Sequence, residues 1–179
     1  MRIPKRRRIE GKTDYGKRIK LLKGNKPRVV FRKTNRYIIA QYVMSKEAQD
    51  KIVIGITSKK LLEYGWPKEA QNSLKSITAS YLTGLLLGIK ILKNKLEQPI
   101  VDLGMTRIIH KSRAFAFIKG LIDSGIKIEC KKEDFPEENR INRKDIPFKE
   151  ILKRISDSYK SEKQDLSDKE IKLKIEKEN

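Results

Sequence analysis

The chain has 179 residues, with 43 Lys or Arg against 23 Asp or Glu, which gives a formal net charge of +20 at pH 7. This length suits one domain with appendages, and so large an excess of cations favours a polyanionic partner, nucleic acid first and an anionic membrane surface second. The single cysteine, Cys130, and the single histidine, His110, exclude an internal disulfide and a Cys/His metal site, so we expect no cofactor and a reducing, cytoplasmic compartment.

The first 36 residues concentrate this charge, with 15 Lys or Arg against the two acids Glu10 and Asp14. Residues 1–12 have no periodic apolar pattern and are predicted to form a disordered basic arm. The residues after Met1 are basic rather than apolar, which is not typical of a signal peptide. The longest apolar stretch, residues 85–92, is too short to span a bilayer.

A short amphipathic helix is predicted over Tyr15–Lys23, where Thr13 and Asp14 are the candidate caps. Its apolar face holds Tyr15, Ile19 and Leu22. Gly24 follows the helix, where a left-handed residue is easiest to place.

Three strands follow, over residues 28–32, 37–44 and 51–56. Polar turns over residues 33–36 and 45–50 separate them. Strands joined by such short turns predict an antiparallel meander.

The hydrophobic period then changes to that of a helix. We predict a connector over residues 57–67, with a helical turn at residues 58–62, and one long helix over residues 68–94. Gly84 and Gly88 share a face of this helix and are expected to let it approach the sheet closely.

A short apolar strand over residues 99–103 and a loop over residues 104–111 come next. Ser112 is the candidate N-cap of a helix that Gly125 ends, and residues 126–130 are predicted to form a fifth strand. This strand–helix–strand order predicts a parallel pair with a right-handed crossover.

The predicted fold class is therefore α/β, with a mixed sheet made of a three-stranded antiparallel meander and parallel strands, and with helices packed on it. The expected organisation is a basic arm at residues 1–12 and an RNA-binding core at residues 13–130. A polar loop and short helix occupy residues 131–156. A charged tail, helical or disordered, occupies residues 157–179.

The basic residues form a long track of candidate phosphate contacts, each of which would release counterions on binding. Thr34 and Asn35 add short polar groups at the tip of the first hairpin. Tyr15 either stacks on a base or packs its helix against the core. The candidate cations are Lys5, Arg6, Arg7, Arg8, Lys12, Arg18, Lys23, Lys26, Arg28, Arg32, Lys33 and Arg36.

A second candidate phosphate site is the segment Lys111, Ser112 and Arg113, because free backbone amides at a helix start favour an anion. The alternative for this segment is a plain capped helix.

RNA is favoured over DNA, because no helix-turn-helix, zinc-finger or zipper pattern is visible and the cations lie on an arm and turns. A DNA-binding or chromatin protein is the alternative from charge alone. A nuclease-like enzyme would need Asp102 as a metal ligand, but no second carboxylate is expected beside it.

Three blocks of sequence occur in order along the chain. The first holds RRRIEGKTDY from Arg6 and LLKGNKPR from Leu21. The second holds DLGM from Asp102 and KSRAFAFIKGLIDSG from Lys111, and the third is FPEENRI from Phe135. Together these blocks resemble the archaeal large-subunit ribosomal protein L-eighteen family, which binds 5S rRNA.

The resemblance implies a ribonuclease-H-like α/β core of the kind found in some translation proteins, without catalysis. It implies a structural constituent of the 50S subunit that binds 5S rRNA and attaches it to 23S rRNA in the central protuberance, beside the L-five family protein and other ribosomal proteins. No DNA or membrane partner is expected. On the RNA side it places Lys5–Arg8, Lys12, Tyr15, Arg18, Lys26, Arg28, Thr34–Asn35 and Lys111–Arg113.

Overall fold

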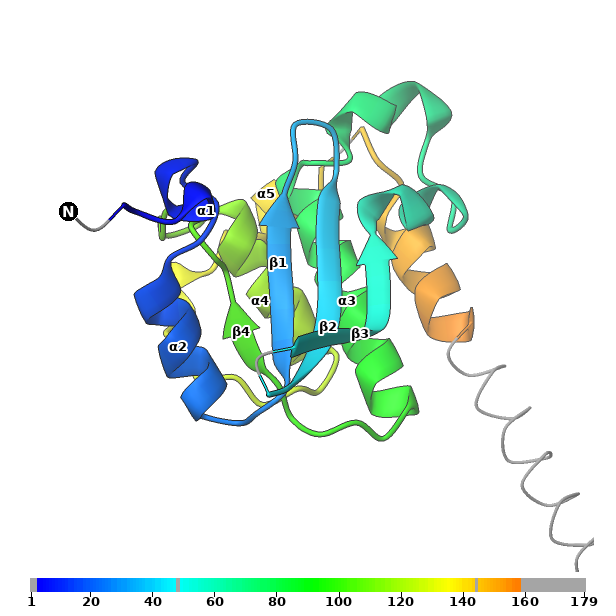
Figure 1. The fold of residues 1–179 in the computed structure, drawn as a ribbon. Coiled ribbons are helices and arrows are strands. Elements are labelled where there is room, and N and C mark those ends of the chain that lie inside the picture. The colour runs from blue at the N-terminus through cyan, green and yellow to red at the C-terminus, as the bar shows by residue number, and fades with distance from the viewer. Residues whose placement is uncertain (1–2, 48, 144, 159–179) are drawn as a thin grey trace, which may run out of the picture.

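The computed structural model describes residues 3–47, 49–143 and 145–158. These residues form a sheet with helices packed on it (Figure 1). Most of the predicted charged tail, residues 159–179, lies outside the described residues, so its character stays a prediction. In the described part of the chain, no helix has the length and apolar character needed to cross a membrane.

The sheet has four strands in the order β3-β2-β1-β4. They are β1 (Arg28–Lys33), β2 (Ile38–Lys46), β3 (Gln49–Thr57) and β4 (Ile100–Asp102). The first three form the predicted antiparallel meander, and β4 pairs with β1 in parallel. The mixed α/β sheet predicted from the sequence is therefore confirmed.

Alternation along β1 and β2 decides which face of the sheet meets the main helices. Val29 and Phe31 of β1 are fully buried, as are Tyr42 and Ala40, their register partners in β2. The alternate residues of β1 that face the other way are Arg28, Val30 and Arg32.

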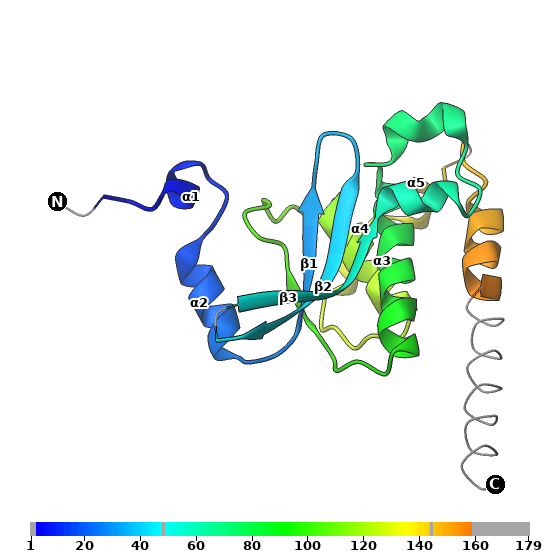
Figure 2. The same ribbon diagram turned by 45° about the vertical axis from the view of Figure 1, so that its right-hand side comes forward.

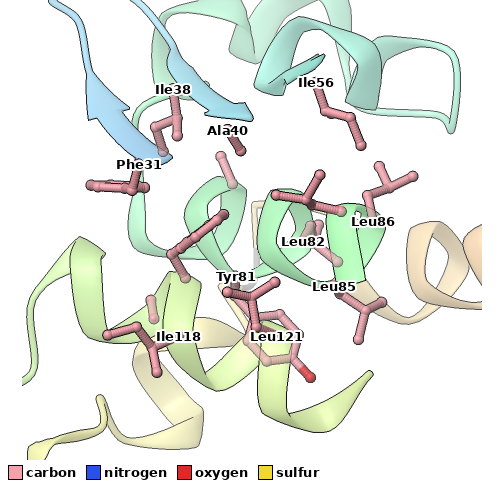
Figure 3. Close-up of a cluster of buried hydrophobic side chains, with 14 of the residues drawn as sticks. Phe31, Ile38, Ala40, Ile56, Tyr81, Leu82, Leu85, Leu86, Ile118 and Leu121 are labelled. Atoms are coloured by element: carbon pink, nitrogen blue, oxygen red, sulfur yellow. The ribbon is translucent and has the colours of Figure 1, made fainter. Parts of the chain in front are cut away.

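The helices α3 (Ile77–Lys93) and α4 (Arg113–Asp123) build the core on the apolar face of the sheet. Ser76 begins α3, because its hydroxyl accepts a hydrogen bond from the backbone N–H of Ala79 at 3.2 Å. Twelve of the 17 residues of α3 are buried, so this helix is apolar nearly all round, as a central helix must be. Figure 3 shows its side chains between those of the strands and those of α4.

Glycines allow α3 and α4 to pack backbone against backbone. A Cβ on Gly84 would collide with the carbonyl oxygen of Phe117, and a Cβ on Gly120 would collide with that of Tyr81. Gly88 likewise faces the side chain of Ser124. The predicted close approach at Gly84 and Gly88 is therefore real, but the neighbour is α4 and not the sheet.

The other side of the sheet carries α2 (Tyr15–Lys23), which has the predicted bounds (Figure 2). Asp14 caps it, with Oδ1 accepting from the backbone N–H of Lys17 at 3.1 Å. Gly24 was expected to adopt the left-handed conformation, but it stays in the right-handed helical region. The left-handed residue is the next one, Asn25, with φ +43°.

The middle of the arm is a helical turn, α1 (Arg6–Ile9), and not the disordered segment that was predicted. Glu10 stabilises this turn, pairing with Arg6 at 3.0 Å and with Lys12 at 2.7 Å. The i,i+4 spacing of Arg6 and Glu10 is one that a single helical turn brings together.

The helix predicted over residues 68–94 is two elements. Residues 68–73 form the 3₁₀ segment η2 (Lys68–Ser73), and the chain turns before α3 begins. The carbonyl oxygen of Ala70 accepts hydrogen bonds from the Trp66 indole at 3.0 Å and the Ser73 hydroxyl at 2.7 Å. Leu74 then donates to Gln71 instead of Ala70, so the α-helical ladder does not continue.

The predicted fifth strand at residues 126–130 does not form, and its predicted parallel pairing is wrong. Gly125, with φ +108°, ends α4 as expected. Ile126 then folds back, with its N–H donating to Leu121 and its side chain near Gly88 of α3. Ile126 is therefore buried against helices, and Ile128 and Cys130 are half-buried at the edge of the core.

The remaining elements are three 3₁₀ or single-turn segments and one longer helix near the end of the described chain. The predicted turn at residues 58–62 is the 3₁₀ segment η1 (Ser58–Leu62), and residues 148–158 form the last described helix. Two short segments lie between α4 and this last helix: η3 (Lys132–Asp134) and α5 (Glu138–Ile141).

We expect Gly84→Ala to lower the free energy of unfolding by about 1–3 kcal/mol, because the new methyl group would push α3 away from the backbone of α4. Urea unfolding measures this change. The control is Gly16→Ala at an exposed position of α2, which should be neutral or stabilising by up to about 1 kcal/mol through helix propensity. Equal effects of the two changes would contradict the packing described.

Candidate nucleic-acid interface

A basic groove lies where the arm, the end of β1 and the loop after β4 meet. Of the eight described residues that line it, five are Lys or Arg and none is Asp or Glu. The lining residues are Arg7, Gly11, Lys12, Arg32, Lys33, Met105, Thr106 and Arg107. Three segments far apart in sequence thus place cations around one concave surface, which is an arrangement suited to phosphate groups.

The arm segment of the basic groove is held by local contacts. The Nε–H of Arg7 donates to the Thr13 hydroxyl at 3.1 Å, and Thr13 directly precedes the cap of α2. Lys12 pairs with Glu10, as described above. The first cations of the groove therefore reach it from a folded segment.

The β1 segment is held by Asp102, the last residue of β4. In the parallel register Asp102 is opposite Val30, so its side chain points to the same face as Arg28 and Arg32 on either side. The Asp102 carboxylate is 3.0 Å from Arg32 Nη2 and 3.7 Å from Arg28 Nη1. Its other oxygen, Oδ1, accepts from the backbone N–H of Gly104 at 2.8 Å.

Arg28 continues the chain of charges away from the groove. Its Nη2 is 2.7 Å from Asp50 and 2.8 Å from the Ser45 hydroxyl, at the far end of β2 and β3. Arg18 of α2 pairs with the other oxygen of Asp50 at 2.9 Å. We call this alternating series, from Arg18 through Asp50, Arg28 and Asp102 to Arg32, the ion-pair chain.

The ion-pair chain lowers the pKa of the Asp50 carboxyl. Burial alone would raise its pKa, but hydrogen bonds from Ser45 and Arg18 and the charges of Arg28 and Arg18 lower the pKa below its ordinary value. The carboxylate form is therefore favoured by the fold.

The structure leaves most of the predicted site residues accessible. Those that are half-buried are Tyr15, Arg18, Arg32, Thr34, Ser112 and Arg113. Those that are exposed are Lys5, Arg6, Arg7, Arg8, Lys12, Lys23, Lys26, Lys33, Asn35, Arg36 and Lys111. The basic groove brings together four of these predicted residues: Arg7, Lys12, Arg32 and Lys33.

Arg28 does not fit its predicted role as a phosphate contact. Its side chain is only 3% exposed, and its guanidinium group is held between Asp50 and Asp102. The sequence placed it on the basic track because a strand pattern does not show which cation meets a carboxylate across the sheet.

Thr34 also has an internal role. Its hydroxyl donates to the carbonyl oxygen of Tyr37 at 2.6 Å and accepts from the N–H of the same residue at 3.0 Å. These two bonds close the β1–β2 turn, and they leave Asn35 and Arg36 as the exposed residues at its tip.

Tyr15 is half-buried, and the Nζ of Lys5 lies 4.6 Å from the centre of its ring. This cation–π contact ties the arm to α2. Among the described residues, Tyr15 is not one of the half-buried hydrophobics that pack on the core, and its stacking on a base stays a prediction.

The second candidate site, at the start of α4, is occupied by protein contacts. Lys111 pairs with Glu137 at 3.0 Å, and the hydrogen bond and charge of Lys111 lower the pKa of that carboxyl. Arg113 donates to the carbonyl oxygen of Lys75 at 3.2 Å. Ser112 stands at the N-cap position, but its hydroxyl makes no capping hydrogen bond.

Sequence reasoning missed Arg107 and Thr106 as groove residues. It also missed that Asp102 forms an ion pair with Arg32. The available signal was the position of Asp102 at the end of a strand, directly before a loop that contains Arg107. Which strand lies beside it was the missing information. No group of three or more His, Cys, Asp or Glu that could hold a metal ion occurs among the described residues.

Comparison with known proteins matches residues 1–99 to a family model described as ribosomal large subunit proteins 60S L5, and 50S L18. The large ribosomal subunit protein uL18 of Korarchaeum cryptofilum (strain OPF8) is 43% identical over 141 residues, which cover 79% of this chain and 70% of that protein. The chain belongs to this L18 family. The resemblance inferred from the three sequence blocks is confirmed.

L18 family proteins are structural components of the large ribosomal subunit and in general are not enzymes. Membership therefore favours the RNA interpretation of the basic groove over the DNA alternative. Asp102, the one residue on which a nuclease-like site would have depended, is engaged by Arg28, Arg32 and Gly104.

We expect Asp50→Asn to destabilise the protein at pH 7 and to matter less in acid. Because the folded-state pKa of Asp50 is lowered, its contribution to stability is present above the unfolded pKa of about 4 and is lost as the pH falls through the folded value. Urea unfolding of wild type and variant at neutral pH and at about pH 3 measures the difference.

The control for this prediction is Asp145→Asn, since the Asp145 side chain is 71% exposed and forms a surface ion pair with Arg143. Such a surface pair contributes little, so the control should change stability by less than about 1 kcal/mol at either pH. A wild-type-to-Asp50→Asn difference that is the same at both pH values would contradict the lowered pKa.

Proposed function

We propose that this L18 family chain binds 5S rRNA and attaches it to 23S rRNA in the central protuberance of the 50S subunit. Its other neighbours there would be the L-five family protein and further ribosomal proteins, so its place is on ribosomes in the cytoplasm. The observation that carries this proposal is the basic groove, which gathers five cations and no acid from the described arm, sheet and loop.

The charges of the groove fit RNA backbone better than a small phosphorylated ligand. Two cations come from the arm, two from the end of β1 and one from the loop after β4, so they surround an open concave surface. Arg36 at the exposed tip of the β1–β2 turn, together with Arg6 and Arg8 of the arm, extends the cationic track beyond the groove, and Asn35 adds a neutral polar group beside Arg36. A folded RNA recognised by shape presents phosphates over such a length.

In this proposal the arm at residues 1–12 and the core at residues 13–130 form one RNA surface. The segment at residues 131–156 supports the start of α4, through pairs such as Lys111 with Glu137. The tail from residue 157 is nearly neutral by sequence and adds nothing to phosphate affinity.

The test changes one groove cation from each segment, in the triple variant Arg7→Gln, Lys33→Gln and Arg107→Gln. Binding to 5S rRNA should weaken, and the slope of log Kd against log salt should flatten by up to about one unit for each lost phosphate contact. Filter binding over a range of salt concentrations measures both quantities.

A matched triple variant, Lys127→Gln, Lys132→Gln and Lys149→Gln, removes three exposed cations outside the groove. It lowers the net charge equally, so it should retain most of the affinity and slope. Equal losses in the two variants would contradict a localised RNA site. Equal binding of wild type to duplex DNA of the same length would contradict specificity for 5S rRNA.

A further inference from the structure

The basic groove has a buried acidic residue directly behind it. Asp102 is 6% exposed, yet it lines the cavity that adjoins the groove and shares Arg7, Lys12, Arg32 and Met105 with it. A carboxylate so close to a phosphate site would oppose RNA binding by simple Coulomb repulsion. The position of Asp102 behind the groove therefore suggests that this residue also has a favourable effect on binding.

Asp102 holds Arg32 from two directions. The carboxylate Oδ2 pairs with Nη2 at 3.0 Å, and the backbone carbonyl of Asp102 accepts from Nη1 at 3.0 Å. A further bond runs from Nη1 to the carbonyl oxygen of Phe31 at 2.8 Å. These three bonds fix the plane of a guanidinium group that is still 42% exposed in the groove.

Asp102 also shapes the loop that carries Arg107. Its Oδ1 accepts from the N–H of Gly104, which has φ +61°. The loop backbone passes close to the same guanidinium group, since a Cβ on Gly104 would lie 2.7 Å from Cζ of Arg32. The carbonyl oxygen of Gly104 accepts from Lys17 Nζ of α2 at 3.4 Å, so both the loop and α2 are fixed relative to Asp102.

We propose that Asp102 is a positioning residue for RNA binding, because its carboxylate orients Arg32 and fixes the loop that brings Arg107 to the basic groove. This inference rests on the proposed function. It goes further by assigning to an acid a favourable role at a phosphate site. The sign of the effect separates the two physical possibilities: Coulomb repulsion alone predicts tighter binding when the acid is removed, and positioning predicts weaker binding.

The test is Asp102→Asn, which keeps the shape of the side chain and removes its charge. The dissociation constant for 5S rRNA should rise on the order of tenfold, the effect of losing one charge-assisted hydrogen bond. The matched control, Glu129→Gln, removes an exposed acid outside the groove and should bind as tightly as wild type or slightly tighter. Binding by Asp102→Asn that equals or exceeds that of wild type would overturn the proposal.

A double-mutant cycle shows whether Asp102 acts through Arg32. In an Arg32→Ala background, Asp102→Asn should weaken binding by clearly less than it does alone, leaving only the part that acts through the loop. Additive losses would overturn the coupling to Arg32. The thermal unfolding midpoint of each variant is measured, and binding is measured well below that midpoint. A weaker affinity then reflects a misoriented Arg32 and not an unfolded protein.

Gly104→Ala provides a second variant in case Asp102→Asn fails to fold. Its methyl group would displace Arg32 at a surface loop while leaving the ion pairs of Arg28 intact, so binding should weaken in the same direction. Unchanged affinity in a folded Gly104→Ala protein would overturn the proposal. A wild-type protein that does not prefer 5S rRNA over other RNAs of the same length contradicts the proposed function instead.

Discussion

The buried guanidinium group of Arg28 links α2, β3 and β4 to β1 beside the basic groove. Taking this cation out of water costs several kcal/mol unless carboxylates accompany it, and removing a partner from such a pair typically costs about 3–5 kcal/mol. Its partners come from separate places: Asp50 from the start of β3 and Asp102 from the end of β4. Arg18 joins through Asp50 and brings α2 with it, so one charge determines the relative positions of three elements.

The cations near this ion-pair chain differ in what surrounds them. Arg28 neutralises acids inside the fold, whereas Arg7, Lys33 and Arg107 lie around a surface whose described lining has no acid. Cations gathered in this way repel each other, and a polyanion relieves that repulsion on binding. The fold therefore meets the cost of assembling the groove before any polyanion binds, and less ordering remains to oppose association.

Local signals in the sequence were sufficient for the meander, the capped helix over Tyr15–Lys23 and the 3₁₀ turn at Ser58–Leu62. Predictions that depended on distant neighbours were less successful. The long helix failed where Trp66 and Ser73 occupy the carbonyl of Ala70, and the fifth strand failed because Ile126 packs on helices. For the same reason charge alone assigned Arg28 to the surface and left Arg107 out.

The parallel pairing of β1 with β4 joins the core to the basic groove. In the observed register Asp102 is opposite Val30, between Arg28 and Arg32, while Val29 and Phe31 face the helices. A slip of one residue would turn the Asp102 carboxylate towards the apolar core and leave both arginines without it. The hydrophobic pattern that selects this register therefore also places Arg32 and the loop to Arg107 at the groove. In this way a basic groove assembled from residues as far apart as Arg7 and Arg107 is specified by the packing of buried apolar side chains.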